Sequence, residues 1–133
     1  PGGSSTAMLT ADELDCSGCY EGMAEAGTAL GTASPIVMTE DTNIVRAMRR
    51  IAQFYAHESC GQCVQCREGP SWTAKILHRI EDGEGTHEDI DTLYHLCEQM
   101  TGRTICPLAD SVVFPLRSSL DKFRGEYEAL IRR

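Results

Sequence analysis

The stretch Cys60-Gly61-Gln62-Cys63-Val64-Gln65-Cys66 is the part of this 133-residue chain that says most about its fold and chemistry. Three cysteines at C-x2-C-x2-C spacing let one tight loop wrap one face of a metal-sulfur core, while a distant fourth cysteine, Cys106, closes the other face. Gly61 would let the backbone approach that core closely. The spacing favours a [4Fe-4S] cluster with Cys60, Cys63, Cys66 and Cys106 as its ligands.

Structural zinc is the alternative metal for the same thiols. Zinc sites prefer two separated ligand pairs, whereas the third cysteine here follows closely on the second. Soft thiolates suit both metals, so a structural zinc-binding interaction module stays open as a second class of function. Rieske-type ligation needs paired histidines, and His78, His87 and His95 stand in no Cys-x-His arrangement.

The overall composition narrows the possible partners. Twenty acidic and twelve basic side chains give a net charge of −8, which argues against nucleic acid because phosphate contacts need clustered Lys and Arg. No apolar run approaches the roughly 18 residues of a membrane-spanning helix, so no direct membrane insertion is expected. Seven cysteines, an odd number, fit poorly with a secreted disulfide framework and favour reduced thiols that hold a metal.

The charge is unevenly distributed along the chain. Residues 1–45 contain seven acidic residues and no Lys or Arg, and they are rich in Gly, Ser, Thr and Ala. Their apolar residues are too sparse for a core, so residues 1–40 are interpreted as an extended or partly β lead-in that packs on something else. Within it, Ile36-Val37-Met38 is either an edge strand or a linker. A chain that starts at Pro1 also suggests processing, or a piece of a longer protein.

Residues 41–133 show helical periodicity and predict a mainly α domain, a small four-helix bundle with short connections. Apolar residues at spacings of three and four predict helices over 42–56, from Pro70 to about residue 81, over 86–101, and from Val112 almost to the C-terminus. Asp41 or Thr42 is the expected N-cap of the first helix. Thr86 followed by Asp89 resembles a capping arrangement.

The cysteine stretch also carries a resemblance to a known family. Phe54-Tyr55-Ala56-His57-Glu58-Ser59 leading into Cys60–Gly69, together with Gly102–Asp110, resembles the C-terminal cluster domain of the NADH-binding flavoprotein subunit of respiratory complex I. Upstream, Pro1–Thr6, Leu30–Thr32 and Ile36–Met38 resemble the end of that family's small β-grasp domain. Val64-Gln65 stands where the family commonly has Thr-Pro, with the ligand spacing kept.

The resemblance implies an electron-transfer role. In the family, the counterparts of Cys60, Cys63, Cys66 and Cys106 ligate a [4Fe-4S] cluster that takes single electrons from reduced FMN, after NADH has delivered a hydride, and passes them towards quinone. The family's flavin and NADH loops lie upstream, so FMN and NAD are assigned to the rest of the subunit and no catalytic residue to this segment.

The resemblance also implies partners and a location. Expected partners are the upstream FMN/NADH-binding domain and the other peripheral-arm subunits with iron-sulfur clusters. The complex would lie on the cytoplasmic side of a bacterial inner membrane or the matrix side of the mitochondrial one, with this segment peripheral. The diaphorase subunits of NAD-dependent formate dehydrogenases and hydrogenases share the motif and remain alternatives.

The remaining cysteines have simpler expected roles. Cys16 and Cys19 form a C-x-x-C pair that could be a redox dithiol or half of a zinc site, with no second pair nearby. Cys97 shares an apolar face with Leu93 and Met100 and is expected to be a buried, inert thiol.

Other side chains near the cysteine stretch have two possible roles each. His57 is expected to pack or cap at a helix end rather than modulate the cluster. Arg67 and Arg103 either stabilise the reduced cluster or pair with Glu58 and Glu68. Trp72 is expected in the core. Backbone N–H groups directed at the sulfurs are expected from residues that flank the ligands, which are Gly61, Gln62, Val64, Gln65 and Ile105.

Overall fold

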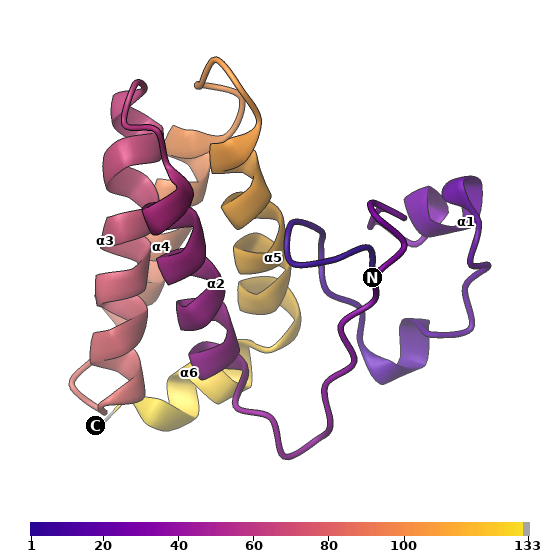
Figure 1. Ribbon diagram of the computed structural model, residues 1–133. Helices are drawn as coiled ribbons and strands as arrows, with labels where there is room; N and C mark the ends of the chain where they lie inside the picture. Colours follow the sequence, from indigo (N-terminus) through magenta and orange to yellow (C-terminus); the bar gives the residue numbers. More distant parts are fainter. Residues whose placement is uncertain (132–133) are drawn as a thin grey trace.

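The computed structural model describes residues 1–131, and within them every regular element is helical. The elements are the 3-10 helix η1 (Ala11–Glu13), then α1 (Tyr20–Glu25), α2 (Ile44–Glu58), α3 (Val64–Glu81), α4 (His87–Met100), α5 (Leu108–Lys122) and α6 (Arg124–Leu130). Helices α2 to α5 run alternately up and down in a bundle, and α6 crosses its lower end (Figure 1). The mainly α prediction is confirmed. Residues 36–38 form no strand, so the linker alternative holds.

The bundle is held together by the apolar faces that the sequence periodicity predicted. Val45 and Met48 of α2, Leu77 of α3 and Leu93 of α4 are all fully buried. Helix α5 contributes a longer buried series in the centre: Ala109, Val112, Val113, Leu116 and Leu120. Each helix therefore contributes one stripe to a shared core, as expected for amphipathic helices.

Helix α3 is longer at its N-terminal end than the sequence predicted. It begins at Val64 and not near Pro70, which lies buried inside the helix. Proline has a helical φ and removes one backbone hydrogen bond, and here the buried neighbours Cys66 and Gly69 pack the turns before it. The prediction treated Pro70 as a start signal, and this extension places Cys66 within a helix.

The other helix ends differ from expectation in two places. Asn43 is the N-cap of α2, not Asp41 or Thr42: its Oδ1 accepts a hydrogen bond of 2.8 Å from the backbone N–H of Arg46. The single C-terminal helix expected from Val112 is two helices separated at Phe123, whose ψ of 24° breaks the regular turn.

The capping arrangement ahead of α4 is confirmed. The backbone N–H of Thr86 donates to Asp89 Oδ2 at 2.8 Å, and the Thr86 side chain completes the box. Asp89 is buried and also pairs with Arg79 of α3. The cap therefore fixes the α3–α4 connection as well as the helix start.

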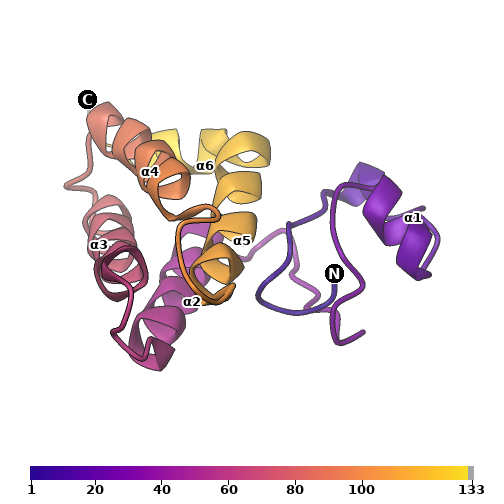
Figure 2. The same ribbon diagram turned by 90° about the horizontal axis from the view of Figure 1, so that it is seen from above.

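The lead-in, residues 1–40, lies along the side of the bundle next to α5 (Figure 2). Its start is joined to residues 29–32 by backbone hydrogen bonds, 3.1 Å from Gly2 N–H to Ala29 O and 3.2 Å from Thr32 N–H to Gly2 O. A Cβ on Gly2 would lie 2.0 Å from the carbonyl oxygen of Leu30, so only glycine allows this approach. Residues 2–32 thus form a ring that is closed by backbone hydrogen bonds and contains η1 and α1.

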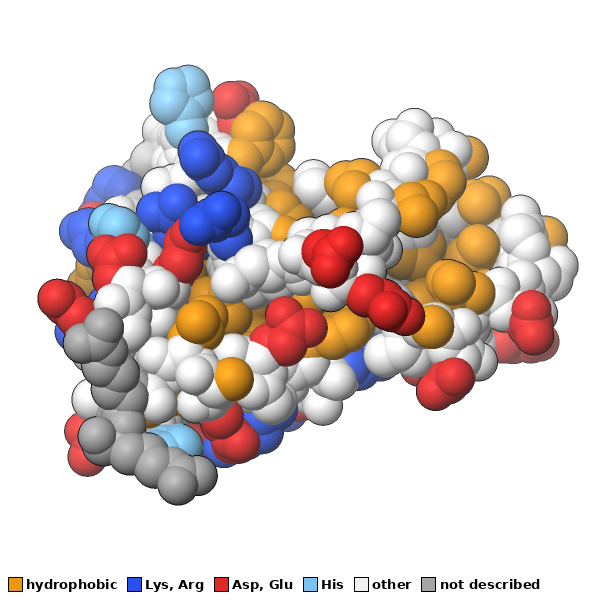
Figure 3. Space-filling model, turned by 90° about the horizontal axis from the view of Figure 1, so that it is seen from below, with side chains coloured by type: hydrophobic (Ala, Val, Ile, Leu, Met, Phe, Trp, Pro, Cys, Tyr) orange, Lys and Arg blue, Asp and Glu red, His pale blue; other side chains and the backbone are white. Residues whose placement is uncertain are grey.

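Hydrogen bonds of Ser118 and Lys122 attach the lead-in to α5. The Met8 N–H donates to Ser118 Oγ at 2.8 Å, and Lys122 Nζ donates to Met8 O at 3.0 Å and to Glu13 Oε2 at 2.7 Å. Between the lead-in and the bundle lies a hollow of about 570 Å³ lined mainly by apolar side chains. Figure 3 shows hydrophobic side chains gathered along this junction. No helix within residues 1–131 is both long and apolar enough to cross a bilayer.

Candidate functional site

Three of the four predicted ligands lie on two loops at the same end of the bundle, and the fourth, Cys66, lies in the adjoining first turn of α3. Residues 59–63 join α2 to α3, and residues 101–107 join α4 to α5. Because α2 and α4 rise towards the same end, both loops lie at the top of Figure 1. The alternating topology therefore brings Cys106 to the end where Cys60, Cys63 and Cys66 are found.

One hydrogen bond joins the two loops directly. The backbone N–H of Ile105 donates to Cys63 Sγ at 3.5 Å, across 42 positions of sequence. An N–H directed at a ligand sulfur is the contact that stabilises thiolate charge in iron-sulfur proteins. Of the flanking residues expected to supply such groups, Ile105 does so here.

Cys66 occupies a different environment from the other three thiols. It is buried in the first turn of α3, and the hydroxyl of Ser59 lies 3.3 Å from its sulfur. Ser59 Oγ also accepts a hydrogen bond of 3.2 Å from the Gly61 N–H. Ser59 was not among the predicted site residues; its place directly before Cys60 was the one signal that could have found it.

The tight turn of the cysteine loop depends on Gly61. Its φ is +80°, a left-handed conformation that favours glycine. Arg67 braces the turn, since its Nη1 donates to Gly61 O at 2.9 Å while its Nε pairs with Glu68 at 3.0 Å. Of the two roles considered for Arg67, the pairing with Glu68 is the one observed. Arg103 is exposed, and no ion pair is found for it within the described residues.

The four thiols differ in exposure. Cys60 and Cys106 are exposed, Cys63 is half-buried and Cys66 is buried, and all are free thiols. Within residues 1–131, no three His, Cys, Asp or Glu side chains are close enough together to hold a metal ion. The structure thus brings the loops together, with a contact at Cys63, but not the four sulfurs. Soft donors on adjoining loops, one of them already accepting a backbone N–H, fit an iron-sulfur cluster chemically.

Two predictions for neighbouring side chains are wrong. Trp72 is 52% exposed, because the face of α3 that is buried runs through Cys66, Thr73 and Leu77. His57 lies in the last turn of α2 with its side chain 86% exposed, and it contacts Glu58 at 3.1 Å without packing on the core.

The prediction for Cys97 is confirmed. Its side chain is almost fully buried in α4, and burial raises the pKa of the thiol to about 12. A thiol with such a pKa is protonated at neutral pH and unreactive. Cys16 and Cys19 lie on the lead-in, which is attached along α5 and not at the end that carries the ligand loops.

Comparison with known proteins places this geometry in a family. Residues 46–130, which include both cysteine loops, match the family described as NADH-ubiquinone oxidoreductase-F iron-sulfur binding region. The chain is 48% identical over 129 residues to a subunit of the NADH-quinone oxidoreductase of Mycobacterium tuberculosis, covering 97% of this chain and 29% of the relative. It is 43% identical to the mitochondrial NADH-ubiquinone oxidoreductase 51 kDa subunit of Neurospora crassa, covering 100% of this chain and 27% of that protein.

A solved structure has the same fold. The crystal structure of an NAD+-reducing [NiFe]-hydrogenase in the H2-reduced state superposes with a TM-score of 0.86 at 28% identity, covering 98% of this chain and 22% of that one. The chain thus spans less than a third of the relatives that it matches. Because the family match extends over most of its length, the chain belongs to the NADH-ubiquinone oxidoreductase-F iron-sulfur binding family, and its 4Fe-4S binding region is the helical bundle.

Proposed function

We propose that this chain is the electron-transfer part of the flavoprotein subunit of an NADH:quinone oxidoreductase, and that Cys60, Cys63, Cys66 and Cys106 hold its cluster. When bound, a [4Fe-4S] cluster accepts and releases single electrons. The observation that carries the proposal is the hydrogen bond from the Ile105 N–H to Cys63 Sγ, within the region matched by the family. It supports one shared site for both loops.

The residues around these thiols would tune the site electrostatically. Ile105 N–H and the Ser59 hydroxyl each lie at a different sulfur, and such donors favour the more negative, reduced form. The guanidinium of Arg67, held by Gly61 O and Glu68, keeps the turn closed. Cys66 is buried and so shielded from water, whereas Cys60 and Cys106 are exposed.

The hydride chemistry would belong to the rest of the subunit. The lead-in, residues 1–40, would be the end of a β-grasp-like domain, and residues 41–133 the cluster domain. The apolar hollow between lead-in and bundle, lined by residues that include Leu14, Val37 and Ile51, is suited to cover by the upstream FMN- and NADH-binding part. The relatives, which are more than three times as long as the matched segment, are consistent with this arrangement.

The finer assignments follow from the same proposal. Other partners would be peripheral-arm subunits with further clusters, on the cytoplasmic side of a bacterial inner membrane or the mitochondrial matrix side. The superposition with an NAD+-reducing hydrogenase favours a second candidate, the diaphorase subunit of such an enzyme. The two candidates can be separated by purifying the native complex and assaying it. Reduction of quinone by NADH would support the NADH:quinone oxidoreductase, and reduction of NAD+ by hydrogen would support the hydrogenase.

The ligand assignment is tested by Cys106→Ser in the full subunit. We expect loss of most iron and acid-labile sulfide, and a lower melting temperature, because ligation closes the loop between α3 and α5. Cys16→Ser, the same chemical change in the lead-in, should keep both. Iron, sulfide and zinc are measured by elemental and colorimetric analysis. A Cys106→Ser subunit with a full cluster and unchanged melting would show that the ligand set is wrong, and stoichiometric zinc in the wild type would favour the zinc module.

A further inference from the structure

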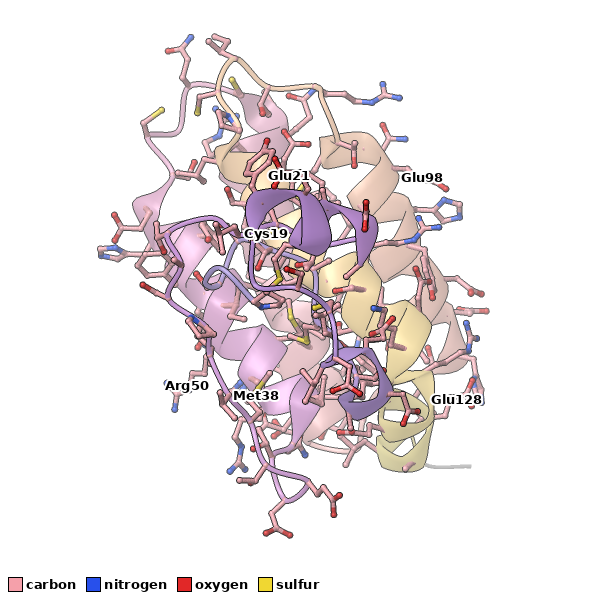
Figure 4. The ribbon with its side chains drawn as sticks, turned by 90° about the vertical axis from the view of Figure 1, so that its right-hand side faces the viewer. Cys19, Glu21, Met38, Arg50, Glu98 and Glu128 are labelled. Carbon is pink, nitrogen blue, oxygen red and sulfur yellow. The ribbon has the colours of Figure 1, made fainter. Side chains whose placement is uncertain are left out.

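The C-x-x-C pair of the lead-in is the motif that the cluster site leaves unused. Cys16 and Cys19 flank Ser17 and Gly18 directly before α1. Both are free thiols, Cys19 exposed and Cys16 half-buried. Figure 4 shows Cys19 at the start of α1, on the part of the lead-in that faces away from the bundle. A reagent in solution would therefore reach Cys19 first.

Two donors point at the Cys19 sulfur. The Ser17 hydroxyl and the Gly22 N–H each donate to Cys19 Sγ at 3.3 Å. These hydrogen bonds, the one from Ser17 above all, lower the pKa of the Cys19 thiol, although the nearby Glu21 carboxylate acts in the opposite direction. Because the thiolate is the reactive form, Cys19 is the nucleophile of the pair. The buried Cys97, with a pKa raised to about 12, shows the opposite environment in the same chain.

Cys16 has the position of a second, resolving thiol. It lines the apolar hollow together with Leu14 and Met23, so it is shielded where Cys19 is open. Between the two, Gly18 is exposed and an added Cβ would meet nothing within 4 Å. This open glycine leaves the intervening turn free to adjust as the sulfurs approach.

From this asymmetry we propose that Cys16 and Cys19 form a thiol-disulfide exchange site, in which Cys19 attacks an external disulfide and Cys16 completes the reaction. The co-reactant is a small or protein disulfide of the glutathione class. The site is separate from the cluster ligands, and the proposal does not depend on the cluster's function.

The exchange balances in two steps. Cys19 thiolate attacks one sulfur of the external disulfide, which breaks its S–S bond, forms a mixed disulfide at Cys19 and releases one thiolate that takes up a proton. Cys16 then loses its proton and attacks Cys19 Sγ, releasing the second external thiol. Two protein thiols are oxidised to one disulfide while one external disulfide is reduced to two thiols.

The test uses the full subunit, reduced under anaerobic conditions and then incubated with oxidised glutathione. Residues 1–45 contain no Lys or Arg, so trypsin leaves both thiols in one peptide that ends at Arg46, apart from the other five cysteines. Mass spectrometry should find this peptide lighter by two hydrogen atoms, and dithiothreitol should reverse the change. Cys16→Ser should accumulate a glutathione adduct at Cys19, while Cys19→Ser should leave Cys16 largely unreacted.

A matched pair of serine variants tests the activation. Ser17→Ala removes the hydroxyl donor and should slow alkylation of Cys19 at pH 7 by roughly threefold. Ser34→Ala, an exposed serine of the same segment that bonds only Thr32 O, should leave the rate unchanged. The proposal is overturned if the peptide stays a dithiol with excess oxidised glutathione, or if Cys16 and Cys19 react equally with it. It is also overturned if Ser17→Ala does not change the alkylation rate of Cys19. A third contradicting result would be zinc in the isolated subunit that both cysteine variants lose.

Discussion

The bundle and the lead-in are built in opposite ways. Among the described residues, the buried apolar side chains belong to the bundle with the single exception of Met8, which lies in the lead-in. The lead-in instead closes on itself through backbone hydrogen bonds at Gly2 and reaches α5 through Ser118 and Lys122. The bundle is stabilised by burial of apolar area, whereas the lead-in is held by a few specific polar contacts.

The difference in packing between the bundle and the lead-in is reflected in their cysteines. The loops with the proposed ligands Cys63 and Cys106 start and end on helices of the packed core. The lead-in offers Cys16 and Cys19 on an exposed turn, which suits thiols that must react rather than hold. Attachment to the packed helices, and not exposure, therefore distinguishes the proposed ligand thiols from the proposed reactive pair, since Cys60 and Cys106 are exposed, as Cys19 is.

The largest expected effect is on the bundle core. Leu93 is fully buried in α4, so Leu93→Ala should lower the free energy of unfolding by about 2–5 kcal/mol through lost burial and a residual cavity. Val37 of the lead-in is 88% exposed, and Val37→Ala should change it by less than about 0.5 kcal/mol. Denaturant unfolding followed by circular dichroism measures both. Equal effects would mean that the two regions form one common core.

The bundle could be predicted from the sequence because apolar residues recur at helical spacing and because capping residues mark helix ends. Thr86 and Asp89 form the expected capping box, and Cys97 lies in the core as its neighbours Leu93 and Met100 indicated. For the thiols, spacing and the family resemblance predicted which cysteines belong together, and the topology places Cys106 at the end of the bundle where the other three lie.

What the sequence could not predict depends on tertiary context. Pro70 is a start signal in isolation, but α3 begins before it, at Val64, with Cys66 buried in its first turn. The inward face of α3 is set by its packing on the other helices, and Trp72 lies outside that face. The break at Phe123 lies within an unbroken apolar series, so periodicity alone could not find it. Likewise, the contact of Ser59 with Cys66 joins a loop to a helix turn, and no spacing rule encodes it.

A smaller effect is expected where the lead-in closes. Gly2→Ala would place a Cβ 2.0 Å from Leu30 O, a backbone atom that cannot move away alone. We expect the ring to open at a local cost of about 3 kcal/mol, with the melting of the bundle unchanged. Hydrogen exchange of the amide of Thr32 measures the local effect. Gly125→Ala, in α6 with nothing within 4 Å of the added Cβ, is the matched control and should leave exchange in the lead-in unaltered.

A still smaller effect is expected from breaking the hydrogen bond that attaches the lead-in to α5. Ser118 Oγ accepts from the Met8 N–H at 2.8 Å in a buried position, so Ser118→Ala leaves that N–H without a partner. A cost of about 1–2 kcal/mol to the docked lead-in is expected, seen as faster proteolysis within residues 1–40. Ser111→Ala removes a hydroxyl that bonds only Pro107 O on the same helix, and it should not change the proteolysis rate. Equal rates for both variants would contradict the role of Ser118.

The smallest effect is expected from pH, at the ion pair between Glu13 and Lys122. The hydrogen bond from Lys122, with that from the Thr10 N–H, lowers the pKa of the Glu13 carboxyl in the docked state. A lowered pKa means that this contribution is present above the pKa of the undocked carboxyl and is lost as pH falls through the docked value. Hydrogen exchange in η1 should therefore lose protection as pH falls from neutral to below the ordinary pKa range of a glutamate carboxyl. Glu13→Gln should flatten that dependence, whereas Glu25→Gln, exposed in α1, should keep it. A flat profile in the wild type would mean that the hydrogen bonds of Met8 with Ser118 and Lys122 hold the lead-in against α5 without the ion pair.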